Sequence, residues 1–169
     1  VEERRANPRE DIVTALTQAE IEGDVLSELE IDLFFLLLAV AGNETTTNLI
    51  GGMVSALLRN PDQLARLRDD PRLIRNAVEE MLRYDGPIQL NNRRLTAPLT
   101  LSGRTLPEGT LITIGIGAAN RDPEQFDDPE RFDVARKPNR HVAFGQGDHV
   151  CVGMNVARME GRIALGRLL

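Results

Sequence analysis

The chain has 169 residues, of which 41% are hydrophobic and 27% charged, and its formal net charge at pH 7 is -6. These values are ordinary for a globular protein and exclude a disordered or collagen-like chain. The acidic balance argues against nucleic acid as a partner, because phosphate binding favours a basic surface. A single cysteine permits no internal disulfide, so we expect a reducing compartment, the cytoplasm.

No secretory signal opens the chain, and its longest apolar run, residues 33–41, is too short to span a bilayer. We therefore expect no membrane partner. The chain begins at Val1 rather than Met and stops at Leu169 inside a helix-like pattern. The expectation is one unit over residues 1–169, truncated at both ends.

The first third of the sequence predicts two helices. A cap and first-turn proline at Asn7-Pro8 begin a short helix that Gly23 closes. Ser27 and Glu30 form the S-x-x-E pattern of a capping box, which opens a long helix through about Arg59. The first half of this helix is apolar almost all round, so we expect it to be buried.

Further along, Asn60-Pro61 and Asp70-Pro71 repeat the cap-and-proline signal and predict two more helices, the second ending at residues 85–87. Short β-like runs at 88–90, 99–101 and 110–114 predict a small antiparallel sheet. The fold class is therefore mainly α with a minor antiparallel β-sheet.

Residues 120–139 are rich in Asp, Pro and Arg and show no period, and a long irregular stretch inside a domain is usually functional or held by specific contacts. A last helix is predicted after Gly153, with Val156, Met159 and Ile163 as its inner stripe.

The strongest chemical feature is the segment Phe144-Gly-Gln-Gly-Asp-His-Val-Cys-Val-Gly153. A lone cysteine is most often a small buried hydrophobe. Here glycines permit tight turns, and the positive end of the following helix favours a thiolate. The pattern suits a metal ligand or a nucleophile. Zinc would require further ligands, and only His149 lies near, whereas His141 leaves a cysteine–histidine nucleophile open.

A second feature, residues 41–47 (AGNETTT), lies in the middle of the long helix. Glycine and three threonines cost stability there, and threonine hydroxyls can bend a helix. Helical spacing places Leu37, Ala41, Glu44, Thr45 and Asn48 on one face. The segment is either a polar packing patch or a groove where something flat approaches the backbone beside a proton path.

A third feature is the pair Glu80 and Arg83, three residues apart on a predicted helix. Such pairs are common, and when exposed they contribute little to the stability of the fold. Arg131 is a candidate third member that would connect the irregular stretch to the helix.

Together and in this order, the three features resemble the cytochrome P450 superfamily. The sequences of residues 41–49 and 120–132 resemble the soluble bacterial branch of that superfamily. The resemblance implies part of the cytochrome P450 fold: a long central helix, a haem-binding Cys loop and the helix that follows. It implies haem b as cofactor, with Cys151 as the iron ligand. Other residues it places at the cofactor are Phe144, Gly145, Gly153, His149, Arg93, Ala41 and Gly42.

The resemblance also assigns roles away from the iron. Glu44 and Thr45 match an acid–alcohol pair that relays protons. A structural network behind the haem would contain Glu80, Arg83 and Arg131, and the substrate would touch Leu37, Val40 and Ile88.

The implied function is a monooxygenase that inserts one atom of O2 into a small organic substrate, with electrons from NAD(P)H through a ferredoxin or a flavoprotein reductase. Five basic residues lie near the cysteine in sequence and either help to dock an acidic redox partner or are simply solvated surface charge: Arg136, Lys137, Arg140, Arg158 and Arg162. The alternatives are a peroxide-using haem-thiolate enzyme, against which the Glu44–Thr45 pair speaks, and a non-catalytic haem-binding fragment. A cysteine hydrolase or a zinc protein is the remaining alternative.

Overall fold

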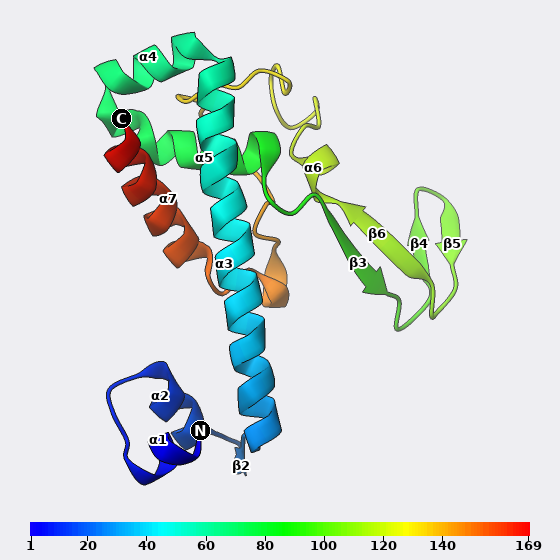
Figure 1. The fold of residues 1–169 in the computed structure, drawn as a ribbon. Helices are drawn as coiled ribbons and strands as arrows, with labels where there is room; N and C mark the ends of the chain where they lie inside the picture. The colour runs from blue at the N-terminus through cyan, green and yellow to red at the C-terminus, as the bar shows by residue number, and fades with distance from the viewer. The chain divides into compact units, whose positions relative to one another are not determined.

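The computed structural model describes residues 1–169, except for the side chain of Ile21. The chain forms two compact units, residues 1–44 and 45–169. Figure 1 shows the helices and strands of the chain. The first unit contains the helices α1 (Glu2–Ala6) and α2 (Ile12–Gln18), then the two-residue strands β1 (Glu20–Ile21) and β2 (Asp24–Val25). It also contains the first part of helix α3 (Glu28–Arg59).

Local side-chain caps fix the helix starts of the first unit. The Asp11 carboxylate accepts a hydrogen bond from the Thr14 N–H at 2.9 Å, so α2 begins after Asp11 and not at the expected Asn7-Pro8. Gly23 does not end a helix but lies in the β1–β2 turn, where its φ of +90° suits glycine. The predicted capping box at Ser27 and Glu30 is present: each residue's backbone N–H donates to the other's side chain.

The second unit continues α3 and adds the helices α4 (Pro61–Asp69), α5 (Ile74–Asp85), α6 (Ile116–Ala119) and α7 (Met154–Leu168). Short 3-10 turns cover η1 (Pro71–Leu73) and η2 (Gly147–His149). The strands are β3 (Leu90–Arg94), β4 (Leu99–Leu101), β5 (Arg104–Leu106) and β6 (Leu111–Gly115). The fold is mostly helical with small antiparallel sheets, as the sequence predicts.

The strands differ in detail from the single predicted sheet. They form two separate antiparallel pairs in this unit, β3 with β6 and β4 with β5. The first strand covers residues 90–94 rather than 88–90, because the pairing partner Gly115 lies opposite Leu90. Residues 120–146 contain no helix or strand, as expected for the irregular stretch.

The core of the second unit lies where α3, α5 and α7 meet. Its fully buried side chains come from those helices, from α4 and from the irregular stretch: Leu49, Met53, Ala56, Leu57, Leu67, Ala77, Val78, Met81, Leu82, Phe132, Val134 and Leu165. Helix α7 packs against α5 (Figure 1). A Cβ on Gly161 would lie 3.2 Å from Val78 Cγ1, so the missing side chain permits the close approach of the two helices.

Two burial predictions are wrong. The inner face of α7 contains Gly161 and Leu165, whereas Val156, Met159 and Ile163 are more than half exposed. The contact face of α7 is the one on which Gly161 approaches Val78 of α5 and Leu165 is buried, so the apolar stripe lies on a different face of the helix.

The first half of α3 is likewise exposed, not buried: Leu36 and Leu37 are 61% and 60% accessible. The short helices and strands of the first unit do not cover the apolar surface of α3. By length and composition α3 could cross a membrane, although core helices of soluble proteins meet the same criterion.

Candidate haem-thiolate site

The Cys151 loop, residues 141–153, places an exposed thiol just before a helix. Its turns require left-handed backbone at Gly145 (φ +72°) and Gly147 (φ +75°), which explains both glycines. The Gly145 N–H donates to the Val142 carbonyl at 2.9 Å, and the Cys151 N–H donates to the Phe144 carbonyl at 2.9 Å. These bonds fold the loop back on itself and leave Cys151 accessible.

Helix α7 begins three residues after the cysteine. Its N-cap is Gly153, no side chain caps it, and its first turn carries no acidic residue. The unpaired amides and the positive end of the helix dipole favour a negatively charged sulfur. A Cβ on Gly153 would lie in ordinary van der Waals contact with Cys151 Sγ, at 4.0 Å, so Gly153 lies directly beside the sulfur.

Phe144 forms the inner side of the loop. It is half-buried and packs against the core of the second unit. The Arg158 guanidinium of α7 lies over the ring at 4.7 Å from its centre, and the His141 ring lies 6.1 Å away, tilted by 54°. The ring is therefore held between the hydrophobic core and a cation.

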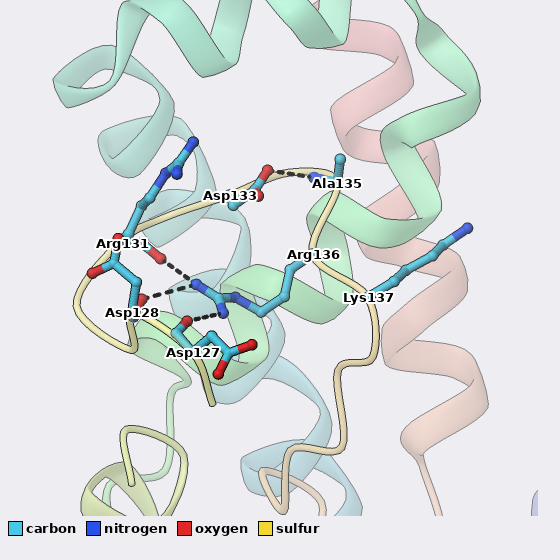
Figure 2. A pocket seen from close by; sticks show the side chains of 7 residues that line it. All are labelled: Asp127, Asp128, Arg131, Asp133, Ala135, Arg136 and Lys137. Carbon is cyan, nitrogen blue, oxygen red and sulfur yellow. Dashed lines mark hydrogen bonds between the residues drawn. The ribbon is translucent and has the colours of Figure 1, made fainter. Parts of the chain in front are cut away.

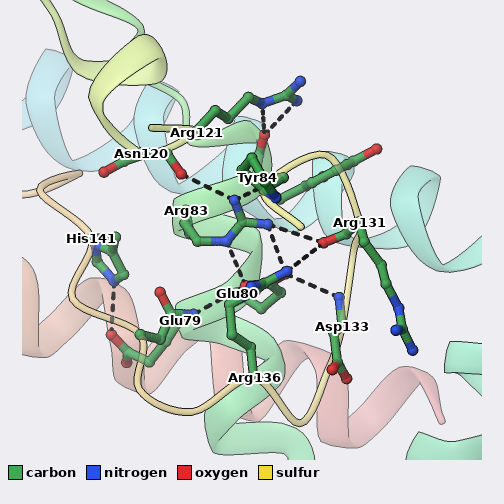
Figure 3. A network of polar contacts seen from close by, with 12 residues as sticks. Glu79, Glu80, Arg83, Tyr84, Asn120, Arg121, Arg131, Asp133, Arg136 and His141 are labelled. Atoms are coloured by element: carbon green, nitrogen blue, oxygen red, sulfur yellow. Dashed lines mark hydrogen bonds and ion pairs between the residues drawn. The ribbon is translucent and has the colours of Figure 1, made fainter. Parts of the chain in front are cut away.

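Glu79 of α5 connects these groups. Arg158 Nε lies 2.9 Å from Glu79 Oε1, and Arg158 Nη2 lies 2.9 Å from Oε2. His141 Nε2 lies 3.1 Å from Oε2, as Figure 3 shows. Burial alone would raise the pKa of Glu79, but hydrogen bonds from His141 and Arg158 and the charge of Arg158 lower it to about 2. Glu79 is thus a stable anion at neutral pH.

The next residue along α5, Glu80, lies at the centre of a buried network. Both Glu80 and Arg83 have fully inaccessible side chains, and two parallel hydrogen bonds of 2.8 and 2.9 Å join them. The remaining Arg83 N–H groups donate to the carbonyls of Asn120, Pro129 and Arg131. All the donors of this guanidinium are therefore satisfied.

The irregular stretch meets this network at Arg131, the predicted third member, and at Arg136. Arg131 takes part through its backbone carbonyl, and its side chain points away (Figure 3). The cation that reaches Glu80 is Arg136, whose Nε lies 3.1 Å from Glu80 Oε1 and whose side chain is only 10% exposed. Asn139 also donates to Glu80, and so does the backbone of Asp133.

Arg136 also borders a polar hollow of about 300 Å³ (Figure 2). Its guanidinium donates to the backbone carbonyls of Asp127, Asp128 and Arg131, whereas Lys137 points outward. Because the Arg136 guanidinium is hydrogen-bonded to these backbone oxygens, the hollow belongs to the network that orders the irregular stretch.

The predicted docking set of five basic residues is divided by these contacts. Arg136 forms an ion pair with the buried Glu80, and Arg158 forms one with the half-buried Glu79. Arg162 Nη2 lies 3.6 Å from Glu79 Oε1. Lys137 and Arg140 remain exposed.

The other residues of the second unit that were predicted to contact cofactor or substrate are accessible. Arg93 of β3 is exposed and donates to Asn91 Oδ1 at 2.7 Å. His149 is exposed in η2, and Ile88 is 41% exposed just before β3. No interaction joins these three side chains to Cys151.

The long helix carries the remaining predicted residues. Leu37, Val40, Ala41, Gly42 and Glu44 lie in the part of α3 that belongs to the first unit, and all are exposed. Thr45 follows directly in the second unit and is half-buried. Glu44 and Thr45 are adjacent on one continuous helix, as predicted.

The sequence analysis did not identify Glu79, and it predicted Arg158 and Arg136 to be exposed residues of a docking surface. No signal separates Glu79 from the many exposed acids of amphipathic helices, because its partners lie 62 and 79 residues along the chain. Arg136, near the end of the predicted irregular stretch, carried a signal: a stretch without periodicity needs side chains that hold its backbone.

Comparison with known proteins gives a consistent result. The Cytochrome P450 family model matches residues 1–169. Cytochrome P450 107B1 of Saccharopolyspora erythraea is 51% identical over 170 residues, all of this chain and 42% of that protein. The crystal structure of substrate-free CYP109E1 from Bacillus megaterium superposes with a TM-score of 0.95 at 43% identity, covering 99% of this chain and 43% of that one.

A further solved structure, P450BioI in complex with an acyl carrier protein ligated to hexadec-9Z-enoic acid, gives a TM-score of 0.94 at 43% identity, over 99% of this chain and 43% of that chain. The chain thus spans less than half the length of the relatives it matches. The match nevertheless covers every motif described above, from α3 to the Cys151 loop. The chain belongs to the cytochrome P450 family.

Proposed function

We propose that this chain carries the iron-binding loop of a haem-thiolate monooxygenase, with Cys151 as the thiolate ligand of haem b. The observation that carries the proposal is the exposed Cys151 thiol in a glycine-turned loop that ends at the uncapped start of α7. Such a setting favours the thiolate, and thiolate ligation pushes electron density toward the iron and favours O–O cleavage.

The residues around the thiol fit a flat apolar cofactor. Val150 and Val152 flank the cysteine and are 41% and 94% exposed, which is unusual for valine and suits contact with a large apolar ring. Gly145 and Gly153 carry no side chain that would obstruct a ring. Among the described residues, no three His, Cys, Asp or Glu side chains gather as a zinc site would require.

When bound, haem b supplies the redox chemistry by which one atom of O2 enters a small organic substrate. Glu44 and Thr45 would hold and deliver protons at the carboxylate and the hydroxyl. Arg93 and His149 would pair with the carboxylates of the cofactor, and Ala41 and Gly42 would leave room beside it. Leu37, Val40 and Ile88 are exposed apolar side chains suited to substrate contact.

The electrons would come from NAD(P)H through a ferredoxin or a flavoprotein reductase in the cytoplasm, without nucleic acid or membrane as a partner. Lys137 and Arg140 are the exposed cations suited to an acidic partner. Reversing both charges is expected to slow electron transfer and to weaken its salt dependence. An unchanged rate at low and high salt would contradict this docking role.

The test of the function is a carbon monoxide spectrum. Haem is added to the purified protein, the iron is reduced, and carbon monoxide is introduced. We expect the strongly red-shifted Soret band of thiolate ligation, its loss in Cys151→Ala, and its retention in the control His149→Ala. A band of histidine type that survives Cys151→Ala, or no haem uptake at all, would contradict the proposal.

A further inference from the structure

Glu79 is the point where three separate segments meet. It lies on α5, and its carboxylate contacts His141 at the start of the Cys151 loop and Arg158 on α7. Its side chain is 22% exposed, and those of His141 and Arg158 are 4% and 25% exposed. Charge-assisted bonds of this geometry, shielded from water, fix the groups they join.

A continuous path leads from Glu79 to the cysteine through Arg158. Two Arg158 nitrogens bind the carboxylate, which orients the planar guanidinium over the Phe144 ring. The Phe144 carbonyl in turn accepts the hydrogen bond from the Cys151 N–H. A change in the position of Arg158 is therefore passed to the residue that supports the cysteine backbone.

A second path runs through His141. Its Nδ1 accepts a hydrogen bond of 3.2 Å from the Ala143 N–H, so the hydrogen-bond network assigns the proton of the neutral ring to Nε2. That nitrogen then donates to Glu79 Oε2. The same carboxylate thus also fixes the backbone that leads into Phe144.

We propose that Glu79 is a positioning residue for the Cys151 thiolate: through Arg158 and His141 it holds Phe144 and the loop amides in the arrangement that presents the sulfur. This inference rests on the proposed haem-thiolate function. Hydrogen bonding and packing around a ligand sulfur tune the stability and potential of its bond to the metal. The neighbouring Glu80 has no such role, because its partners lie at residues 83, 133, 136 and 139, outside the loop.

The test uses the full-length haem-loaded protein with the variants Glu79→Gln and Arg158→Lys. Glu79→Gln removes the anion, and Arg158→Lys keeps the charge balance but loses the planar contact with Phe144. The matched control is Glu130→Gln, because Glu130 is an exposed acid paired with Arg121. The readouts are the carbon monoxide Soret band, the midpoint potential of the iron and the thermal midpoint of unfolding.

Both variants are expected to lose part of the thiolate-type band, and Glu79→Gln is also expected to raise the midpoint potential, because the Arg158 charge is then uncompensated. The control keeps the wild-type values. A merely structural role would lower the thermal midpoint while leaving band and potential unchanged, and that result would overturn the proposal.

The wild-type spectrum separates the two hypotheses. A wild-type protein without the thiolate-type band contradicts the proposed function itself, and the role of Glu79 toward the thiolate with it. A normal wild-type band that both variants retain contradicts only the positioning role. If Glu79→Gln does not bind haem, Arg158→Lys decides: a partial loss of its band supports the role, and an intact band contradicts it.

Discussion

Glu79 and Glu80 are adjacent on α5, yet they face different environments. Glu80 is fully buried and accepts hydrogen bonds from Arg83, Arg136, Asn139 and the backbone of Asp133. Glu79 is partly exposed and contacts the Cys151 loop and α7. The comparison teaches that one helical turn can serve both stability and a reactive site: one carboxylate orders the irregular stretch, and the other orders the loop beside the sulfur.

The largest expected effect is on the buried side of this comparison. Arg83→Ala leaves Glu80 without its bidentate partner and leaves the carbonyls of Asn120 and Pro129 without this donor, whereas the Arg131 carbonyl keeps its bond from Arg136. Breaking a buried pair in this way costs about 3–5 kcal/mol of the free energy of unfolding. Urea unfolding followed by circular dichroism would measure it. A loss below about 1 kcal/mol would show that water replaces the guanidinium and that the network contributes little.

A second prediction compares the side chains of Arg136 and Arg131 in this network. Arg136→Ala removes the bond to Glu80 and three bonds to backbone carbonyls, and we expect a cost of about 1.5–3 kcal/mol. Arg131→Ala keeps the Arg131 carbonyl in place and should change stability by less than about 0.5 kcal/mol. The two variants are compared in the same unfolding experiment. Equal losses would mean that the Arg131 side chain contributes as well.

The sequence predicts much of this fold because its signals are local. The capping box at Ser27, the prolines after Asn60 and Asp70, and the glycines of the Cys151 loop each act within a few residues. Pairs such as Glu80–Arg83 are also local and were found. By contrast, Arg136 reaches Glu80 across 56 residues, and although the irregular stretch indicates that some of its side chains hold the backbone, no local pattern identifies Glu80 as the partner.

Burial was harder to predict for a physical reason. Apolar periodicity shows which face of a helix avoids water, but it does not show which element covers that face. On α7 the tight contact uses Gly161 against Val78, and the apolar stripe of Val156 lies elsewhere. On α3 the apolar surface around Leu37 has no cover among the described residues.

A third prediction concerns pH and tests the exposed side of the comparison. The pKa of Glu79 is lowered from 4.5 to about 2 in the folded state, so its carboxylate stabilises the fold fully above pH 4.5. This contribution is lost as the pH falls from 4.5 toward 2. After allowance for solvent screening it amounts to about 1–2 kcal/mol.

Glu79→Gln should therefore lower stability at pH 7 and remove part of the acid dependence between pH 4.5 and 2. Unfolding midpoints measured across that range for the wild type and the variant would show this. Parallel curves for the two proteins would contradict the assigned pKa.

The smallest expected effect is at an exposed pair. Arg121 and Glu130 form an ion pair in which the Glu130 side chain is 70% exposed. Glu130→Gln should change the free energy of unfolding by less than about 0.5 kcal/mol, because water screens the charges. Unfolding in low and high salt provides the measurement. If Glu130→Gln lowered the free energy of unfolding as much as Arg136→Ala does, exposed carboxylates would contribute as much stability as buried ones, and the comparison would be wrong.

The most direct test of the account is X-ray absorption at the iron edge of the haem-loaded protein, which identifies the atoms bound to iron. We predict one sulfur neighbour in the wild type and in the control Glu130→Gln, a longer or more variable iron–sulfur distance in Glu79→Gln, and no sulfur in Cys151→Ala. An iron surrounded only by nitrogen and oxygen in the wild type would contradict the assignment of Cys151 as the thiolate ligand.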